Sequence, residues 1–286
     1  IRRDGEEELH RPTASLLWSG MTAGILISFS VLGEAILRAY LPDAQWAYLV
    51  ENLGYSFGFL LIILGRMQLF TENTITTILP LVMRWDLTCL WLVLRLWGLV
   101  LAANVVGAAV AADFIVHSGT MADPLLAAIF ELSHHATGFP PGVAFLKAIP
   151  AGILVAAIVW MIPAQQGNEV MIIVLITWLI AAGDFTHIIA GSVEMWVLLL
   201  SGDLAPGAAA LDFFLPVLAG NVAGGTAVFA FLAWGQLTGA GADPLRAGLT
   251  RRGVRAMVEG GLGPGPGDSL PCARGLQPPV RPLSLG

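Results

Sequence analysis

The chain has 286 residues, of which 56% are hydrophobic and only 12% are charged, and its mean hydropathy is +0.78. Soluble domains carry about 25% charged residues, so the composition excludes an ordinary soluble protein and indicates an integral membrane protein. The formal net charge of -6 identifies no partner, because the location of charges matters more than their sum. Two cysteines, Cys89 and Cys272, do not make a disulfide framework.

A charged arm, residues 1–13, precedes the first predicted membrane span at residues 16–40. That span is long enough for the roughly 20-residue helix that crosses a bilayer. Glu34 and Arg38 are four positions apart and share a helix face, which predicts an ion pair near the end of this helix. No short apolar segment with a small-residue cleavage site is apparent, so no removable signal peptide is expected.

The second span is interrupted by polar residues. Apolar residues 48–64 and 75–83 flank the sequence GRMQLFTENT, which places Arg66, Thr71 and Glu72 between them. A centrally placed charge costs roughly 2.5 to 3.5 kcal/mol on insertion scales, so such residues face a protein interior or a water-filled path. The interruption is predicted to be a helix break.

The fifth span, residues 170–200, has a similar interruption, which contains Asp184, His187 and Glu194. By the same energetic argument, this segment is also predicted to be a broken helix. Both breaks are expected to line one pore.

The remaining predicted spans are continuous and lie at residues 87–116, 144–163 and 211–234. Residues 117–141 form a polar connection that contains His134 and His135. Adjacent side chains do not share a helix face and no cysteine accompanies them, so neither a metal site nor a cofactor is expected.

The composition changes after residue 238. Residues 239–286 begin with a basic segment and continue with many Pro and Gly residues, which cannot build a core. This tail is predicted to be disordered, and residues 14–238 are predicted to form the membrane domain.

The basic residues predict the orientation of the chain. Lys and Arg are absent from the connections at residues 41–47, 117–142 and 201–210, whereas the two ends of the chain and Arg84 are basic. By the positive-inside rule, both termini are expected in the cytoplasm.

An internal repeat organises the spans. The sequence AGIL occurs at residues 23–26 and 151–154, and Asn-Val-x-Gly begins at both Asn104 and Asn221. Three spans per copy is an odd number, so the copies, about residues 14–117 and 142–238, must insert with opposite orientation. The predicted fold is therefore all-α, with six transmembrane helices in two inverted three-helix repeats, the second and fifth helices being broken.

Small and amide residues of the repeat have predicted structural roles. We expect Asn104 and Asn221 to support the breaks by hydrogen bonding. A set of glycines is expected to permit close helix packing: Gly20, Gly24, Gly107, Gly152 and Gly224.

These motifs together resemble the formate/nitrite transporter family of prokaryotic anion channels and transporters. The resemblance covers roughly residues 14–237 and rests on Leu-Phe-Thr in the first break, Phe-x-His in the second, and the Asn-x-x-Gly elements. Gly152, Val155 and Trp160 of the fourth span contribute as well.

The resemblance implies a homopentamer in the bacterial inner membrane, in contact with lipid and without a nucleic-acid partner. Each aquaporin-like subunit would carry its own pore for a small monovalent anion or its conjugate acid. Thr71 and His187 would meet at the centre of the pore, between hydrophobic constrictions. The family pattern implies three constriction residues and their offsets suggest three more: Leu69, Phe70 and Val155, then Tyr55, Phe59 and Ile180.

The chemistry of the central pair suits such a solute. An anion in an apolar constriction loses hydration, and a histidine can supply a proton or a positive field there. Thr71 would orient the imidazole or the solute by a hydrogen bond. The alternatives are that His187 is a packing residue and that Thr71 only satisfies backbone groups freed by the break.

The chain departs from the family pattern at five positions. Relatives commonly have Glu where this chain has Thr186, and Asn where it has Gly191 and Gly152. In the first break they commonly have Gly and an acidic residue, where this chain has Arg66 and Gln68. Asp184 is a candidate to replace the missing Glu. Arg66 could either provide a positive field in the pore or form a buried pair with Glu72, Asp184 or Glu194.

The residues disfavour one other class of function and leave a second one open. A hydrolase built on Ser192 and His187 is disfavoured, since the residues lie five apart and no Gly-x-Ser-x-Gly is present. We therefore expect no enzyme. A non-transporting membrane sensor or assembly protein on the same fold is the alternative that stays open.

Overall fold

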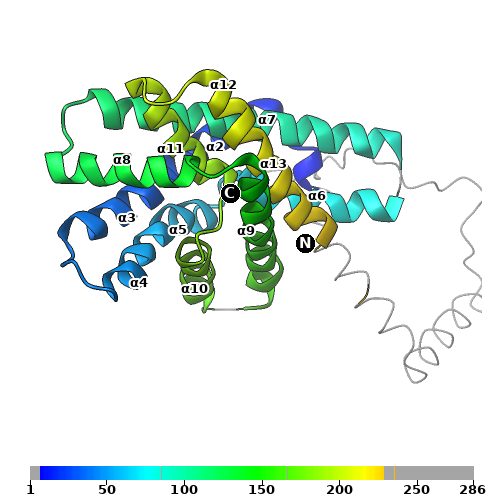
Figure 1. The fold of residues 1–286 in the computed structure, drawn as a ribbon. Coiled ribbons are helices and arrows are strands. Elements are labelled where there is room, and N and C mark those ends of the chain that lie inside the picture. Colours follow the sequence, from blue (N-terminus) through cyan, green and yellow to red (C-terminus); the bar gives the residue numbers. More distant parts are fainter. Residues whose placement is uncertain (1–6, 85, 166, 229–234, 236–286) are drawn as a thin grey trace, which may run out of the picture. The chain divides into compact units, whose positions relative to one another are not determined.

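The computed structural model describes residues 7–84, 86–165, 167–228 and 235. Within these residues the chain is helical and contains no strand (Figure 1). The described part contains five helical segments that are long and apolar enough to cross a membrane: Thr13–Tyr40, Ala47–Leu64, Leu87–His117, Pro141–Ala164 and Pro206–Ala227. The predicted tail, residues 239–286, lies outside the described residues.

Several of these segments are built from consecutive shorter elements. The first joins α2 and α3, the second joins α4, η1 and α5, and the last joins α12, η3, α13 and η4, whereas α7 is a single helix. The bounds of the elements are α2 Thr13–Leu26, α3 Ser28–Tyr40, α4 Ala47–Glu51, η1 Asn52–Tyr55, α5 Ser56–Leu64, α7 Leu87–His117, α9 Pro141–Met161, η2 Ile162–Ala164, α12 Pro206–Ala208, η3 Ala209–Phe214, α13 Leu215–Val222 and η4 Ala223–Val228.

Both predicted helix breaks are present. In the first, α5 ends at Leu64 and α6 (Phe70–Arg84) begins six residues later; in the second, α10 (Glu169–Ala182) is followed by α11 (Ile188–Ser201). Arg66 and Asp184 are the non-glycine residues of the described chain with a positive φ, at 52° and 56°. A left-handed conformation costs an L-residue roughly 1–2 kcal/mol, so each break stores strain at an equivalent position.

Glycines bring the helices of each repeat into backbone contact. A Cβ atom on Gly24 would collide with the carbonyl group of Asn104, and one on Gly152 would collide with that of Asn221. Equivalent collisions would occur between Gly107 and Met21 and between Gly224 and Ile149. Met21 and Ile149 each lie two residues before an AGIL sequence. The repeat predicted from these motifs is therefore confirmed by matching contacts, and so is the role of the glycines.

The polar connection contains a helix that the sequence analysis did not predict. Helix α8 (Asp123–Thr137) begins with an acidic residue followed by Pro124, which suits a first helical turn. Its buried face includes Ile129 and Leu132, and it packs against α3 and α11. The helix thereby reaches the second break, where His135 Nε2 lies 2.9 Å from Asp184 Oδ1; Figure 1 shows α8 beside α3 and α11.

The predicted ion pair between Glu34 and Arg38 is wrong. Arg38 instead reaches two other elements: Nη1 lies 3.2 Å from Glu51 Oε1 on α4, and Nη2 lies 2.6 Å from Glu131 Oε1 on α8. The hydrogen bond from Arg38 lowers the pKa of the Glu131 carboxyl. The long Arg38 side chain thus ties three elements together, and Glu34 has no ion pair among the described residues.

The contacts at Gly107 predict a stability difference between two glycines of α7. Gly107→Ala would force backbone apart and should destabilise the protein by roughly 1–3 kcal/mol, because an overpacked site must shift. Gly98 has open space around its Cα, so Gly98→Ala should be neutral or stabilising. Thermal melting of both variants in detergent checks this. Equal melting temperatures would contradict the close-packing account.

Candidate functional site

The two breaks bring Thr71 and His187 together. Thr71 lies in the first turn of α6 and His187 is the N-cap residue of α11. Thr71 Oγ1 lies 2.9 Å from His187 Nε2, and the two residues are only 1% and 2% exposed. A buried polar pair therefore joins the two halves of the repeat.

The hydrogen bonds of His187 define its neutral tautomer. The backbone N–H of Ala190 donates to Nδ1 at 3.3 Å, so Nδ1 acts as an acceptor. In a neutral imidazole the other nitrogen then carries the hydrogen. His187 Nε2 accordingly donates to Thr71 Oγ1, which leaves the hydroxyl hydrogen of Thr71 available to a solute.

Asn104 holds the first break in place. Its Oδ1 accepts from the backbone N–H of Phe70 at 2.9 Å. Its Nδ2 donates to the carbonyl oxygens of Gly20, at 2.7 Å, and Gln68, at 2.9 Å. The predicted role of this asparagine is confirmed.

Asn221 does the same at the second break. Its Oδ1 accepts from the N–H of Ile188 at 2.8 Å, and its Nδ2 donates to Ala148 O at 2.8 Å and Thr186 O at 3.0 Å. The six hydrogen bonds of the two asparagines match one for one between the copies. The predicted role of Asn221 is confirmed as well.

The N-termini of the half-helices α6 and α11 meet at the same point. The N–H groups of Thr71 and Ile189 occupy equivalent positions, one residue after the N–H that each asparagine binds. Within the described ranges, no carbonyl before either helix accepts from them. The positive ends of two helix dipoles therefore converge at the Thr71–His187 pair.

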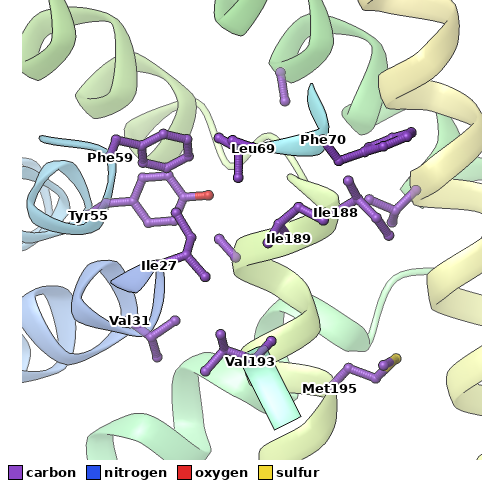
Figure 2. Packing of buried hydrophobic residues seen from close by; sticks show 14 of the residues in the cluster. Ile27, Val31, Tyr55, Phe59, Leu69, Phe70, Ile188, Ile189, Val193 and Met195 are labelled. Carbon is purple, nitrogen blue, oxygen red and sulfur yellow. The ribbon is translucent and has the colours of Figure 1, made fainter. Parts of the chain in front are cut away.

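Buried apolar side chains pack around the starts of the two half-helices, among them Leu69, Phe70 and Ile188 (Figure 2). The ring of Phe59 meets that of His187 edge to face with centroids 5.1 Å apart, and Tyr55 follows at 5.3 Å from Phe59. Phe70 instead packs against Trp97 at 5.9 Å. All six proposed constriction residues are buried, at 0% exposure for four of them and at 2% and 7% for the last two: Leu69, Phe59, Val155, Ile180, Phe70 and Tyr55. That they narrow the path of a solute stays a prediction.

Two cavities lead toward the pair from the α8 side of the molecule. The larger, of about 430 Å³, is lined by residues of α3, α4 and α8. The smaller, of about 70 Å³, reaches Tyr55, Thr186, His187 and Glu194. Their walls carry carboxyl groups that the sequence analysis did not assign to the site, including Glu34 and Glu51. Both residues lie inside apolar spans, and a carboxyl group in such a place could have marked them as site residues in the sequence.

Asp184 forms an ion pair with Lys147 and does not contact His187. Lys147 Nζ lies 2.7 Å from Asp184 Oδ2 and donates to its backbone oxygen at 3.1 Å, and His135 Nε2 lies 2.9 Å from Oδ1. Lys147 also lies over the ring of Phe139. These contacts hold the strained Asp184 conformation. Lys147 was missed in the sequence, although a cation inside an apolar span was a usable signal.

Arg66 is exposed and forms no ion pair with Glu72, Asp184 or Glu194 in the described chain. The buried-pair alternative for Arg66 is therefore wrong. Glu72 has a buried oxygen, Oε1, without a hydrogen-bond partner among the described residues.

Two of the departures from the family pattern have a steric cause. A Cβ atom at Gly152 would collide with Asn221, and one at Gly191 would stand 2.5 Å from Cζ of Phe213. Neither position has room for an asparagine. Ser192 donates to Ile188 O at 2.6 Å, away from a hydrolase arrangement with His187. In the described residues no group of three or more His, Cys, Asp or Glu side chains could hold a metal ion.

The fold and site define a class of membrane protein, in which two inverted repeats bring broken helices to a buried Thr–His pair. The chain belongs to the formate/nitrite transporter family, whose pattern matches residues 1–235. It is 38% identical over 175 residues to the inner membrane protein YfdC of Escherichia coli (strain K12). That alignment covers 61% of this chain and 56% of the relative, so it spans little more than half of YfdC.

Two solved structures share the fold. A pentameric formate channel with formate bound has a TM-score of 0.69 at 21% identity, covering 79% of this chain and 97% of its own. An ion channel of the same family has a TM-score of 0.70 at 18% identity, covering 82% and 95%. At these identities the likeness extends to the fold alone.

Removal of Asn221 should destabilise the second break. Asn221→Ala would leave Ile188 N–H and the carbonyl oxygen of Thr186 without the side chain that binds them, at a cost of roughly 1–3 kcal/mol for each group left buried and unsatisfied. Thermal melting in detergent measures the loss. The matched control is Asn168→Ala, which alters an exposed asparagine without a side-chain cap bond. Equal melting temperatures for Asn221→Ala and Asn168→Ala would contradict the role of Asn221 in supporting the break.

Proposed function

We propose that this protein is a transmembrane channel or transporter for small monovalent anions, such as formate or nitrite, or for their conjugate acids. The observation that carries the proposal is the buried contact between Thr71 and His187 at the meeting point of two half-helix N-termini. Family membership supports the same class of function.

The donors at this point suit an anion. The Thr71 hydroxyl hydrogen and the N–H groups of Thr71 and Ile189 offer hydrogen bonds, and the two helix dipoles add a positive field. An anion that loses water in an apolar passage needs such compensation, because an isolated charge is costly to bury. A small solute that can approach both residues closely is favoured over a large one.

The imidazole of His187 provides a second way to lower the cost of moving an anion through an apolar passage. A protonated His187 could donate its proton to the bound anion, and the resulting neutral acid would cross apolar walls at a much lower cost. Phe59 lies against the ring, and Leu69, two residues before Thr71, is fully buried, so the solute would meet such walls. Electrostatic stabilisation and proton transfer both place His187 in direct contact with the solute.

We further propose a homopentamer in the inner membrane with both termini in the cytoplasm. The pentameric formate channel of the same fold supports the assembly, and YfdC supports the membrane. Large apolar side chains remain exposed on the outward faces of the helices, and lipid or neighbouring subunits would cover them: Trp18, Phe29, Leu87, Trp91, Val106 and Leu146. The basic termini support the orientation.

The test is solute flux in liposomes that contain the purified protein. We expect at least one of formate, nitrite, acetate, lactate, hydrosulfide and bicarbonate to permeate faster than through protein-free vesicles. His187→Ala should lower that flux by about tenfold or more, because a group that binds or protonates the solute is lost. The matched control is His117→Ala, at an exposed histidine at the end of α7, which should transport like the wild type.

Absence of flux for the whole panel would sink the channel proposal and favour a sensor or assembly role. Flux that is insensitive to His187→Ala at both acid and neutral pH would instead remove His187 from the mechanism. Size-exclusion chromatography of the wild type and both variants shows whether the oligomer is intact, and a pentamer is expected.

A further inference from the structure

The two cavities share five lining residues. We name this set the collar, and it consists of Glu34, Leu132, His135, Ala181 and Asp184. Its residues come from α3, from α8, and from the end of α10 with the break that follows. A solute that moves from the larger cavity into the smaller one, and so to His187, passes the collar.

Two acidic residues stand in the collar. Glu34 has no hydrogen bond or ion pair among the described residues, and Asp184 is bound by Lys147 from behind, since Lys147 lines neither cavity. His135 is the collar residue that can carry a positive charge. Its Nε2 lies 2.9 Å from Asp184 Oδ1, and its side chain is 61% exposed. The charge of the collar therefore depends on whether His135 is protonated.

The groups on either side do not supply the missing positive charge. In the larger cavity, Arg38 forms ion pairs with Glu51 on α4 and with Glu131, which lies four residues before His135 on α8. The phenol of Tyr48 donates to the backbone oxygen of Ala182.

Beyond the collar, the smaller cavity presents Glu194, Tyr55 and the neutral form of His187. Carboxyl groups thus outnumber the Lys and Arg side chains along this path, and a proton on His135 makes the path more favourable to an anion.

We propose that His135 is a specificity-determining residue, which favours the passage of anions to the central pair when it is protonated and loses this effect when it is neutral. The inference rests on the proposed channel function. Histidine is the side chain whose ordinary change of charge falls between pH 5 and 8, so a test compares one pH near each end of that range. One added positive charge within several ångströms of the path changes the local anion concentration by a factor of about ten.

The chain provides a matched control at the neighbouring position. His134 is also exposed, at 56% of its side chain, and lies 3.6 Å from Asp203. It lines neither cavity. His134→Gln removes an imidazole from the same turn of α8 without altering the collar.

The experiment measures formate flux into liposomes at pH 5.5 and pH 8 for wild type, His135→Gln, His135→Arg and His134→Gln. Comparison at one pH is decisive, because the proportion of formic acid is then the same for every variant. His135→Gln should reduce flux at pH 5.5 by about five- to tenfold and match wild type at pH 8. His135→Arg should raise flux at pH 8 by a similar factor, and His134→Gln should follow wild type at both values.

The proposal is overturned if His135→Gln and His135→Arg both follow the wild-type profile. It is also overturned if both lose flux equally at both pH values, since His135 would then only position Asp184. Wild-type liposomes impermeable to every solute of the panel would refute the channel function itself, and the inference with it. Melting temperatures near that of wild type establish that the variants are folded.

Discussion

The structure depends on the pairing of backbone groups that two broken helices expose inside an apolar interior. Each unpaired N–H or C=O in lipid costs several kcal/mol, so the breaks survive only because something else binds these groups. Asn104 and Asn221 do so, each with one acceptor and two donor contacts. The glycines beside them allow the helices to approach closely enough for amides of this length to reach.

Function arises where the two copies differ. The equivalent asparagines and glycines build the same frame twice, but one copy places a threonine at its break and the other a histidine. At the left-handed positions, the first copy has an exposed arginine, whereas the second has an aspartate clamped by Lys147 and His135. The symmetric frame therefore carries an asymmetric passage, with carboxyl groups concentrated on the α8 side.

The asparagine and glycine frame could be predicted from the sequence, whereas the ion pairs around the larger cavity could not. Polar residues stand out in apolar spans, so the breaks, the asparagine supports and the small-residue contacts were readable from local patterns. The partners of Arg38 and Asp184 come from α4, α8 and α9, and no local pattern ranks such distant partners. Helix α8 was missed because a polar segment between spans has the composition of a loop, and the ring of Phe213 that excludes a larger residue at Gly191 is likewise a tertiary effect.

The central claim is that Thr71 and His187 act on the solute as one unit. A double-mutant cycle on formate flux, with Thr71→Ala, His187→Ala and the double variant at one pH, tests this most directly. The account predicts strong coupling, in which the double variant is hardly slower than the His187→Ala variant. Losses that multiply independently would show that the 2.9 Å contact is structural and that the two residues do not share a solute.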